Sequence, residues 1–169
     1  LTPDNIEQYF DNCEEPFNTD DATTTAAYRD EAKGIAVDLP YNPNWGSDRL
    51  RLAPYDVNPY YGGGPGETVA FGPMVTFPGC DWVRAYFLHF DSAEPAEKVV
   101  ESVPAYAEPT VATIGTFTVV RYTVSSLCDQ PTIEVIGSKH NYRFTTLCET
   151  PEEGFPFFEQ IIQTMELID

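Results

Sequence analysis

The sequence predicts an α+β domain in which a twisted antiparallel β-sheet is flanked by a few helices. From residue 32 onward, short apolar runs are separated by Pro, Gly and Asn, a pattern typical of strands joined by turns. Helical spacing of apolar residues occurs in only a few stretches, most clearly near the C-terminal end. The length of 169 residues fits one domain of ordinary size.

Acidic residues dominate the charge. The chain has 27 Asp and Glu against 9 Lys and Arg, a formal net charge of −18. Such a charge repels phosphate, so we expect no nucleic acid as a partner. No apolar run reaches the roughly 18 to 20 residues of a membrane span, so we expect membrane contact only through an anchor outside this sequence. The first residue is Leu1, which suggests removal of an upstream signal or anchor, although a cloning boundary would look the same.

The first 32 residues differ from the rest and predict a helix followed by an acidic arm. Thr2-Pro3-Asp4 resembles a helix start, with a capping residue, a proline and an acid near the positive helix end. Residues 11–32 are mainly polar, so we expect an arm on the surface. We therefore divide the chain into an N-terminal helix and acidic arm, residues 1–32, and a single globular α+β domain, residues 33–169.

The order of elements within the domain follows from apolar patterning. Strands are expected at 34–39, 50–55, 69–77, 82–90, 110–114, 117–126, 132–136 and 141–147, and helices at 95–103 and 156–165. The strand at 82–90 has apolar residues on both faces, which predicts a central strand covered on both sides.

The last three strands predict a register. If Gly137 to His140 forms a two-residue hairpin turn, Glu134 lies opposite Arg143, and the preceding loop sets Thr123 beside Glu134. Two faces result. The core face carries Val120, Tyr122, Val124, Ile133, Val135, Tyr142 and Phe144, and the polar face carries Arg121, Thr123, Ser125, Thr132, Glu134, Arg143 and Thr145.

Four cysteines, an even number, predict two disulfides and a location outside the cytoplasm. No pair has the CxxC spacing, so a structural zinc site has little support, and four free buried thiols are the alternative in a cytosolic protein. The same register brings Asp129 near Cys148. This favours a Cys128–Cys148 bridge and leaves Cys13 to pair with Cys80.

Two segments resemble the ends of PsbP-like domains. They are IAVDLPYNPNW at 35–45 and FFEQIIQTMELI at 157–168. PsbP-like domains are extracytoplasmic, related to an extrinsic subunit of photosystem II and common as bacterial lipoproteins. The resemblance implies an α/β/α sandwich, with helices on both sides of an antiparallel sheet, outside the cytoplasm. The four cysteines and the acidic segment depart from the family pattern, and no functional residue of the family matches a motif here.

The acidic arm is a candidate calcium site, because calcium prefers six to eight oxygen ligands. Its carboxylates are Asp11, Glu14, Glu15, Asp20 and Asp21. Their spacing matches no known calcium loop, and a run of carboxylates is usually a solvated surface. We expect no other cofactor.

The segment at 58–67, NPYYGGGPGE, is expected to be a loop. Its glycines match neither phosphate-binding pattern. Tyr60 and Tyr61 beside them are candidates for stacking on a sugar or a peptide.

No catalytic motif is present in the sequence, which lacks both GxSxG and HExxH. The candidate bases are the two histidines. His89, at the end of a strand, is expected to be partly buried with its hydrogen bonds satisfied, and His140, in a turn, is expected to be exposed. Nothing singles out a carboxylate pair among the 27 acids, so we expect no catalytic residue.

Arg121, Glu134 and Arg143 make the polar sheet face the most informative feature. A structural interpretation is a solvent-facing sheet with a cross-strand Glu134–Arg143 pair. A functional interpretation is a recognition surface for an anion or carboxylate of a partner.

The sequence therefore predicts a non-catalytic extracytoplasmic binding or assembly module. Its expected partner is a protein or a small anionic or saccharide ligand. Two alternatives are a small secreted hydrolase with carboxylate acid/base chemistry and a structural acidic surface domain.

Overall fold

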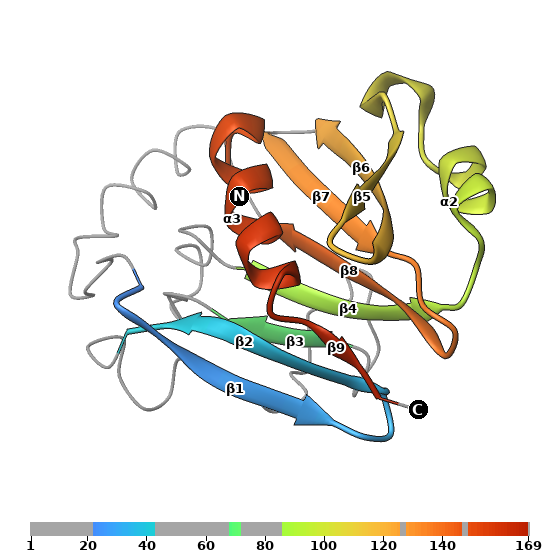
Figure 1. Ribbon diagram of the computed structural model, residues 1–169. Helices are drawn as coiled ribbons and strands as arrows, with labels where there is room; N and C mark the ends of the chain where they lie inside the picture. The colour runs from blue at the N-terminus through green and yellow to red at the C-terminus, as the bar shows by residue number, and fades with distance from the viewer. Residues whose placement is uncertain (1–21, 43–67, 72–85, 126–127, 147–148, 169) are drawn as a thin grey trace, which may run out of the picture.

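The computed structural model in Figure 1 describes residues 22–42, 68–71, 86–125, 128–146 and 149–168. Nine strands in this part of the chain form two antiparallel sheets. The large sheet has the order β3 (Thr68–Phe71), β4 (Tyr86–Ser92), β8 (His140–Thr146), β7 (Asp129–Val135), β6 (Phe117–Ser125), β5 (Thr110–Ile114). The small sheet has the order β1 (Thr24–Asp30), β2 (Ile35–Tyr41), β9 (Glu166–Leu167).

Two α-helices cover opposite faces of the large sheet. Helix α3 (Pro151–Ile162) and the small sheet lie on one face and share the main core with it. Helix α2 (Ala96–Ser102), followed by the short 3₁₀ helix η3 (Ala105–Ala107), lies on the other face and buries Val120. The expected α+β class is confirmed at this coarse level, with antiparallel sheet as the main component of the described part.

The C-terminal helix follows its apolar spacing but is longer than predicted. Phe158, Ile161 and Ile162 are buried against the large sheet. The helix begins at Pro151 rather than near Pro156, which lies inside it. Pro151 stands in the first turn, where its missing N–H has no intrahelical partner.

The prediction of a central strand at 82–90 is confirmed for its described half. Strand β4 pairs with β3 on one side and β8 on the other. Its residues from Phe87 to Phe90 are all buried.

The prediction of a polar arm over 11–32 is wrong at its C-terminal end. Residues Thr24–Asp30 form strand β1, paired along its whole length with β2. Most of its side chains are exposed, but Tyr28 reaches the core. The polar composition that suggested an arm belongs instead to an edge strand, in which most side chains are exposed and Tyr28 is buried. The rest of the arm lies outside the described residues.

The hairpin register between β7 and β8 is confirmed. Glu134 pairs with Arg143, and Val135 with Tyr142. Gly137 fits this turn closely, since a Cβ there would lie 2.3 Å from the carbonyl oxygen of His140.

The predicted register between β6 and β7 is wrong. Val120, not Thr123, pairs with Glu134. Strand β7 begins before Pro131 rather than after it. The prediction started the strand after this proline, because proline lacks the N–H that would donate to a neighbouring strand. In the structure Pro131 is buried inside the strand, and its ring lies against Gly154 of α3.

This shift of three residues exchanges the faces of β6, because side chains alternate along a strand. Arg121 therefore lies on the α3 face, where its Nη2 is 2.6 Å from Glu159 Oε1. Val120 and Tyr122 instead pack under α2. The predicted polar face is correct for β7 and β8 and wrong for β6.

Cys128 is the single cysteine among the described residues, and it is disulfide-bonded. Cys13, Cys80 and Cys148 lie outside them, so the two pairings stay predictions. Nearby, the backbone N–H of Glu149 donates to the carbonyl oxygen of Asp129 at 3.2 Å, one residue past the position that the β7–β8 register places opposite Asp129.

Candidate functional site

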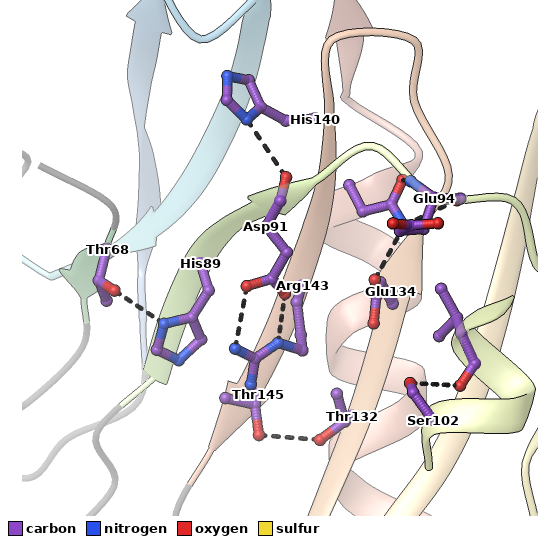
Figure 2. A network of polar contacts seen from close by, with 12 residues as sticks. Thr68, His89, Asp91, Glu94, Ser102, Thr132, Glu134, His140, Arg143 and Thr145 are labelled. Atoms are coloured by element: carbon purple, nitrogen blue, oxygen red, sulfur yellow. Dashed lines mark hydrogen bonds and ion pairs between the residues drawn. The ribbon is translucent and has the colours of Figure 1, made fainter. Parts of the chain in front are cut away.

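A row of directly opposed residues crosses all six strands of the large sheet on the α2 side. In strand order it consists of Thr68, His89, Arg143, Glu134, Val120 and Val111. Helix α2 packs over Val120, at the apolar end. We call the other end, made of Thr68, His89, Arg143 and Glu134, the polar row. Figure 2 shows the side chain of Arg143 between those of His89 and Glu134.

Arg143 is held by a two-point ion pair with Asp91. Its Nε and Nη2 lie 2.6 and 3.2 Å from the two carboxylate oxygens. The two side chains are 25% and 35% exposed, so the pair lies at the accessible surface of the row. Burial opposes the charge of the guanidinium, but the hydrogen bonds and charge of Asp91 outweigh it and raise its pKa.

Glu134 is a buried carboxyl with two hydrogen-bond donors. Asn141 Nδ2 donates to its Oε1 at 3.0 Å, and the Tyr122 hydroxyl lies 3.5 Å from its Oε2. Only 6% of Glu134 is exposed, and this burial raises the pKa of its carboxyl despite the Asn141 hydrogen bond. Burial likewise raises the pKa of the Tyr122 hydroxyl, which stays protonated.

His89 is buried and neutral. Its Nδ1 lies 2.8 Å from the hydroxyl oxygen of Thr68, and both residues are almost fully buried. Burial, reinforced by the charge of Arg143, lowers the pKa of His89 to about 4. The sequence-based expectation of a hydrogen-bonded histidine is confirmed, and His89 is more deeply buried than the partly buried side chain that was expected.

Two further contacts extend the row toward its neighbours. The hydroxyls of Thr132 and Thr145 lie 2.9 Å apart across β7 and β8. His140 is partly buried rather than exposed, because its Nδ1 contacts the carbonyl oxygen of Asp91 at 3.2 Å, as Figure 2 shows.

The structure brings together only two of the three residues predicted for the sheet face. Glu134 and Arg143 are neighbours, and Arg121 is on the opposite face. Tyr60 and Tyr61 lie outside the described residues. So do the candidate calcium ligands Asp11, Glu14, Glu15, Asp20 and Asp21. Within the described residues, no cluster of three or more potential metal ligands occurs.

Sequence reasoning missed four participants: Asp91, Asn141, Tyr122 and Thr68. One signal was available for Asp91. It is two residues from His89 on the same strand, so alternation places both side chains on one face. Tyr122 was missed because the β6 register was wrong.

The side chains around Arg143 are fixed by one another, so the site is preorganised. Arg143 uses two of the five N–H donors of a guanidinium on Asp91, and within the described part of the chain its other donors have no hydrogen bond and could serve a bound group. The exposed parts of this ion pair present donors and acceptors side by side. Such an arrangement is suited to hydrogen-bonded recognition.

Comparison with family models, with curated proteins and with solved structures finds no match to this chain. Among the helices in the described part, none has the length and apolar character of a membrane span.

Proposed function

We propose that this chain is a non-catalytic binding or assembly module that acts outside the cytoplasm, and that the polar row is its contact surface. The observation that supports this most is the partly exposed Arg143–Asp91 pair. It stands on a sheet whose neighbouring side chains, His89 and Glu134, are buried and hydrogen-bonded. Rigid support of this kind lowers the entropy lost on binding.

The protonation states support binding rather than catalysis. A general base works best with a pKa near the working pH. The pKa of His89 is lowered to about 4, and its Nδ1 is engaged by Thr68. Thr68 itself is fully buried, so it is a poor candidate for a nucleophile.

The ligand class that fits the row is a small anionic or saccharide molecule, or a segment of a protein. We suggest a thermal-shift panel of glutarate, galacturonate, maltose and a short uncharged peptide. A panel member that binds should raise the melting temperature of the wild-type protein and of Arg29→Gln, whose exposed side chain lies on β1. It should not raise that of Arg143→Gln. Equal shifts in both variants would reject the polar row as the site.

A secreted hydrolase with carboxylate chemistry is the second candidate, and the raised pKa of Glu134 favours it. An acid catalyst needs such a pKa, but also access to substrate, and Glu134 is only 6% exposed. Glu134→Gln should abolish any hydrolysis of glycosides or esters if this carboxyl acts as the acid. Activity unchanged in Glu134→Gln would reject the role.

The proposed location outside the cytoplasm is supported by the disulfide at Cys128 and by the acidic composition. A PsbP-like sandwich remains part of this proposal, supported by helices on both faces of the large sheet. Mass spectrometry of non-reduced peptides should find Cys128 joined to Cys148. A Cys128–Cys13 or Cys128–Cys80 peptide would contradict the pairing.

A further inference from the structure

Natural sheets protect their edge strands, because the unpaired N–H and C=O groups of an edge can pair with another chain. Three of the four edges of the described sheets have such protection. Strand β1 ends with the charges of Arg29 and Asp30, and β9 has only two residues. Strand β3 lies beside β2, with Thr68, Val69 and Phe71 fully buried.

The fourth edge, β5, lacks these features. Its sequence TVATI contains no charge and no proline. Within the described sheets it pairs with β6 alone and ends the large sheet, as Figure 1 shows. Thr110 and Thr113 are exposed, and Val111 is 56% exposed, so the strand presents an uncharged, partly apolar edge.

We propose that β5 is a docking edge for an extended, Lys- or Arg-rich segment of a partner protein, which adds to the large sheet as a further strand. In this mode main-chain hydrogen bonds supply affinity, and alternate side chains supply specificity. Val111 offers an apolar contact on the α2 side of such a strand. The edge is separate from the polar row, so the two proposals stand or fall independently.

The charges around β5 favour a basic occupant. Glu108 is exposed two residues before the strand, and α2, which contacts β5, carries the exposed Glu97 and Glu101. Glu101 is paired with Lys98, whereas Glu97 and Glu108 have no ion pair within the described residues. A second copy of the chain would bring a further charge of −18, and repulsion would oppose its docking. A basic strand is attracted by the same field.

The test uses an acetylated and amidated peptide of sequence KVKVKVK as the probe, with amide hydrogen exchange and a titration as readouts. We expect saturating peptide to slow exchange of amides within 110–114. Thr113→Lys places a cation on the edge and should weaken the peptide's affinity about tenfold. Val111→Lys is a second variant with the same expectation, in case the first unfolds.

Thr25→Lys is the matched control, because it makes the same change at an exposed position of the other long edge, β1. It should alter the affinity by no more than about twofold. Equal weakening in both threonine variants would mean attraction to the overall charge and would overturn the proposal. Unchanged exchange at 110–114 would overturn it too. So would self-association of the chain alone with protection of these amides, which would make a second copy the occupant.

Discussion

Arg143 connects the two halves of the polar row. It lies directly opposite His89 on β4 and Glu134 on β7, and it holds Asp91 by two hydrogen bonds. Half of this arrangement follows from the sequence, because the hairpin turn fixes the pairing of Glu134 with Arg143. The partner Asp91 comes from a strand 52 residues earlier, and local patterning does not specify that pairing.

Removal of Arg143 should destabilise the fold. Arg143→Ala leaves Asp91 and Glu134 close together without the intervening positive charge. Because the ion pair is partly exposed, we expect a loss of about 2 kcal/mol in the free energy of unfolding, measured by urea denaturation. The control Arg29→Ala removes an exposed pair with Glu31 and should cost no more than about 0.5 kcal/mol. Equal losses would show that the partly buried setting of Arg143 adds nothing to the stability of the fold.

His89 should make the fold sensitive to acid. Its pKa is about 4 in the folded protein against 6.5 for an unperturbed histidine, so the unfolded chain binds the proton more tightly between these values. Stability due to His89 is therefore present above pH 6.5 and is lost as the pH falls toward 4, by about 3 kcal/mol in total.

The measurement is urea unfolding between pH 7 and pH 4 for the wild type and for His89→Gln, in which this contribution should be missing. His140→Gln is the control, because it removes a histidine that is not part of the polar row. Glu134 acts with the opposite sign, because its raised pKa makes the folded state bind the proton more tightly. Parallel pH profiles for wild type and His89→Gln would contradict the neutral, buried state of His89.

At the scale of elements, most strands were predicted from apolar alternation and turn residues. The bounds of β5 agree fully with the prediction, and those of β6 nearly so. The facing of β6 failed because the connection between β6 and β7 sets the register, and that register differs from the prediction by three residues. An odd shift in a connection exchanges every side chain of the strand, whereas the strand's own pattern stays compatible with both arrangements. Both faces of β6 carry valines, Val119 on one and Val120 on the other, so burial did not discriminate between them.

Gly154 of α3 lies directly against Pro131 of β7, and this close approach gives a prediction at the scale of elements. A Cβ at position 154 would lie 2.3 Å from Cγ of Pro131, in a ring that has little freedom to move. Alanine is favoured over glycine in a helix by about 1 kcal/mol, but the clash outweighs this gain. Gly154→Ala should therefore destabilise the protein by about 1–3 kcal/mol in urea unfolding.

Gln160→Ala provides the control, because Gln160 is an exposed position of the same helix. It should change the unfolding free energy by less than about 0.5 kcal/mol. A Gly154→Ala variant more stable than the wild type would mean that the helix does not approach β7 this closely.

For the whole molecule, the charge of −18 implies self-repulsion in the folded state. Salt screens such repulsion, since the Debye length falls from about 10 Å at 0.1 M to about 3 Å at 1 M. We expect the melting temperature to rise gradually with sodium chloride or any other monovalent salt.

Calcium bound at a specific site would change the melting temperature in a different way from charge screening by salt. A specific site filled at 100 times its dissociation constant adds about 2.7 kcal/mol, or roughly 5–10 °C for a domain of this size. A saturable rise of that size with millimolar calcium alone would contradict simple screening. It would make the acidic segment at 11–21 a metal site.

The measurement that tests the central claim most directly is amide NMR mapping of a ligand from the panel that raises the melting temperature. The proposal predicts that the largest shifts cluster on β4, β7 and β8 around Asp91, Glu134 and Arg143, and that Arg143→Gln removes them. Shifts that cluster elsewhere, or that persist in Arg143→Gln, would contradict the polar row as the contact surface.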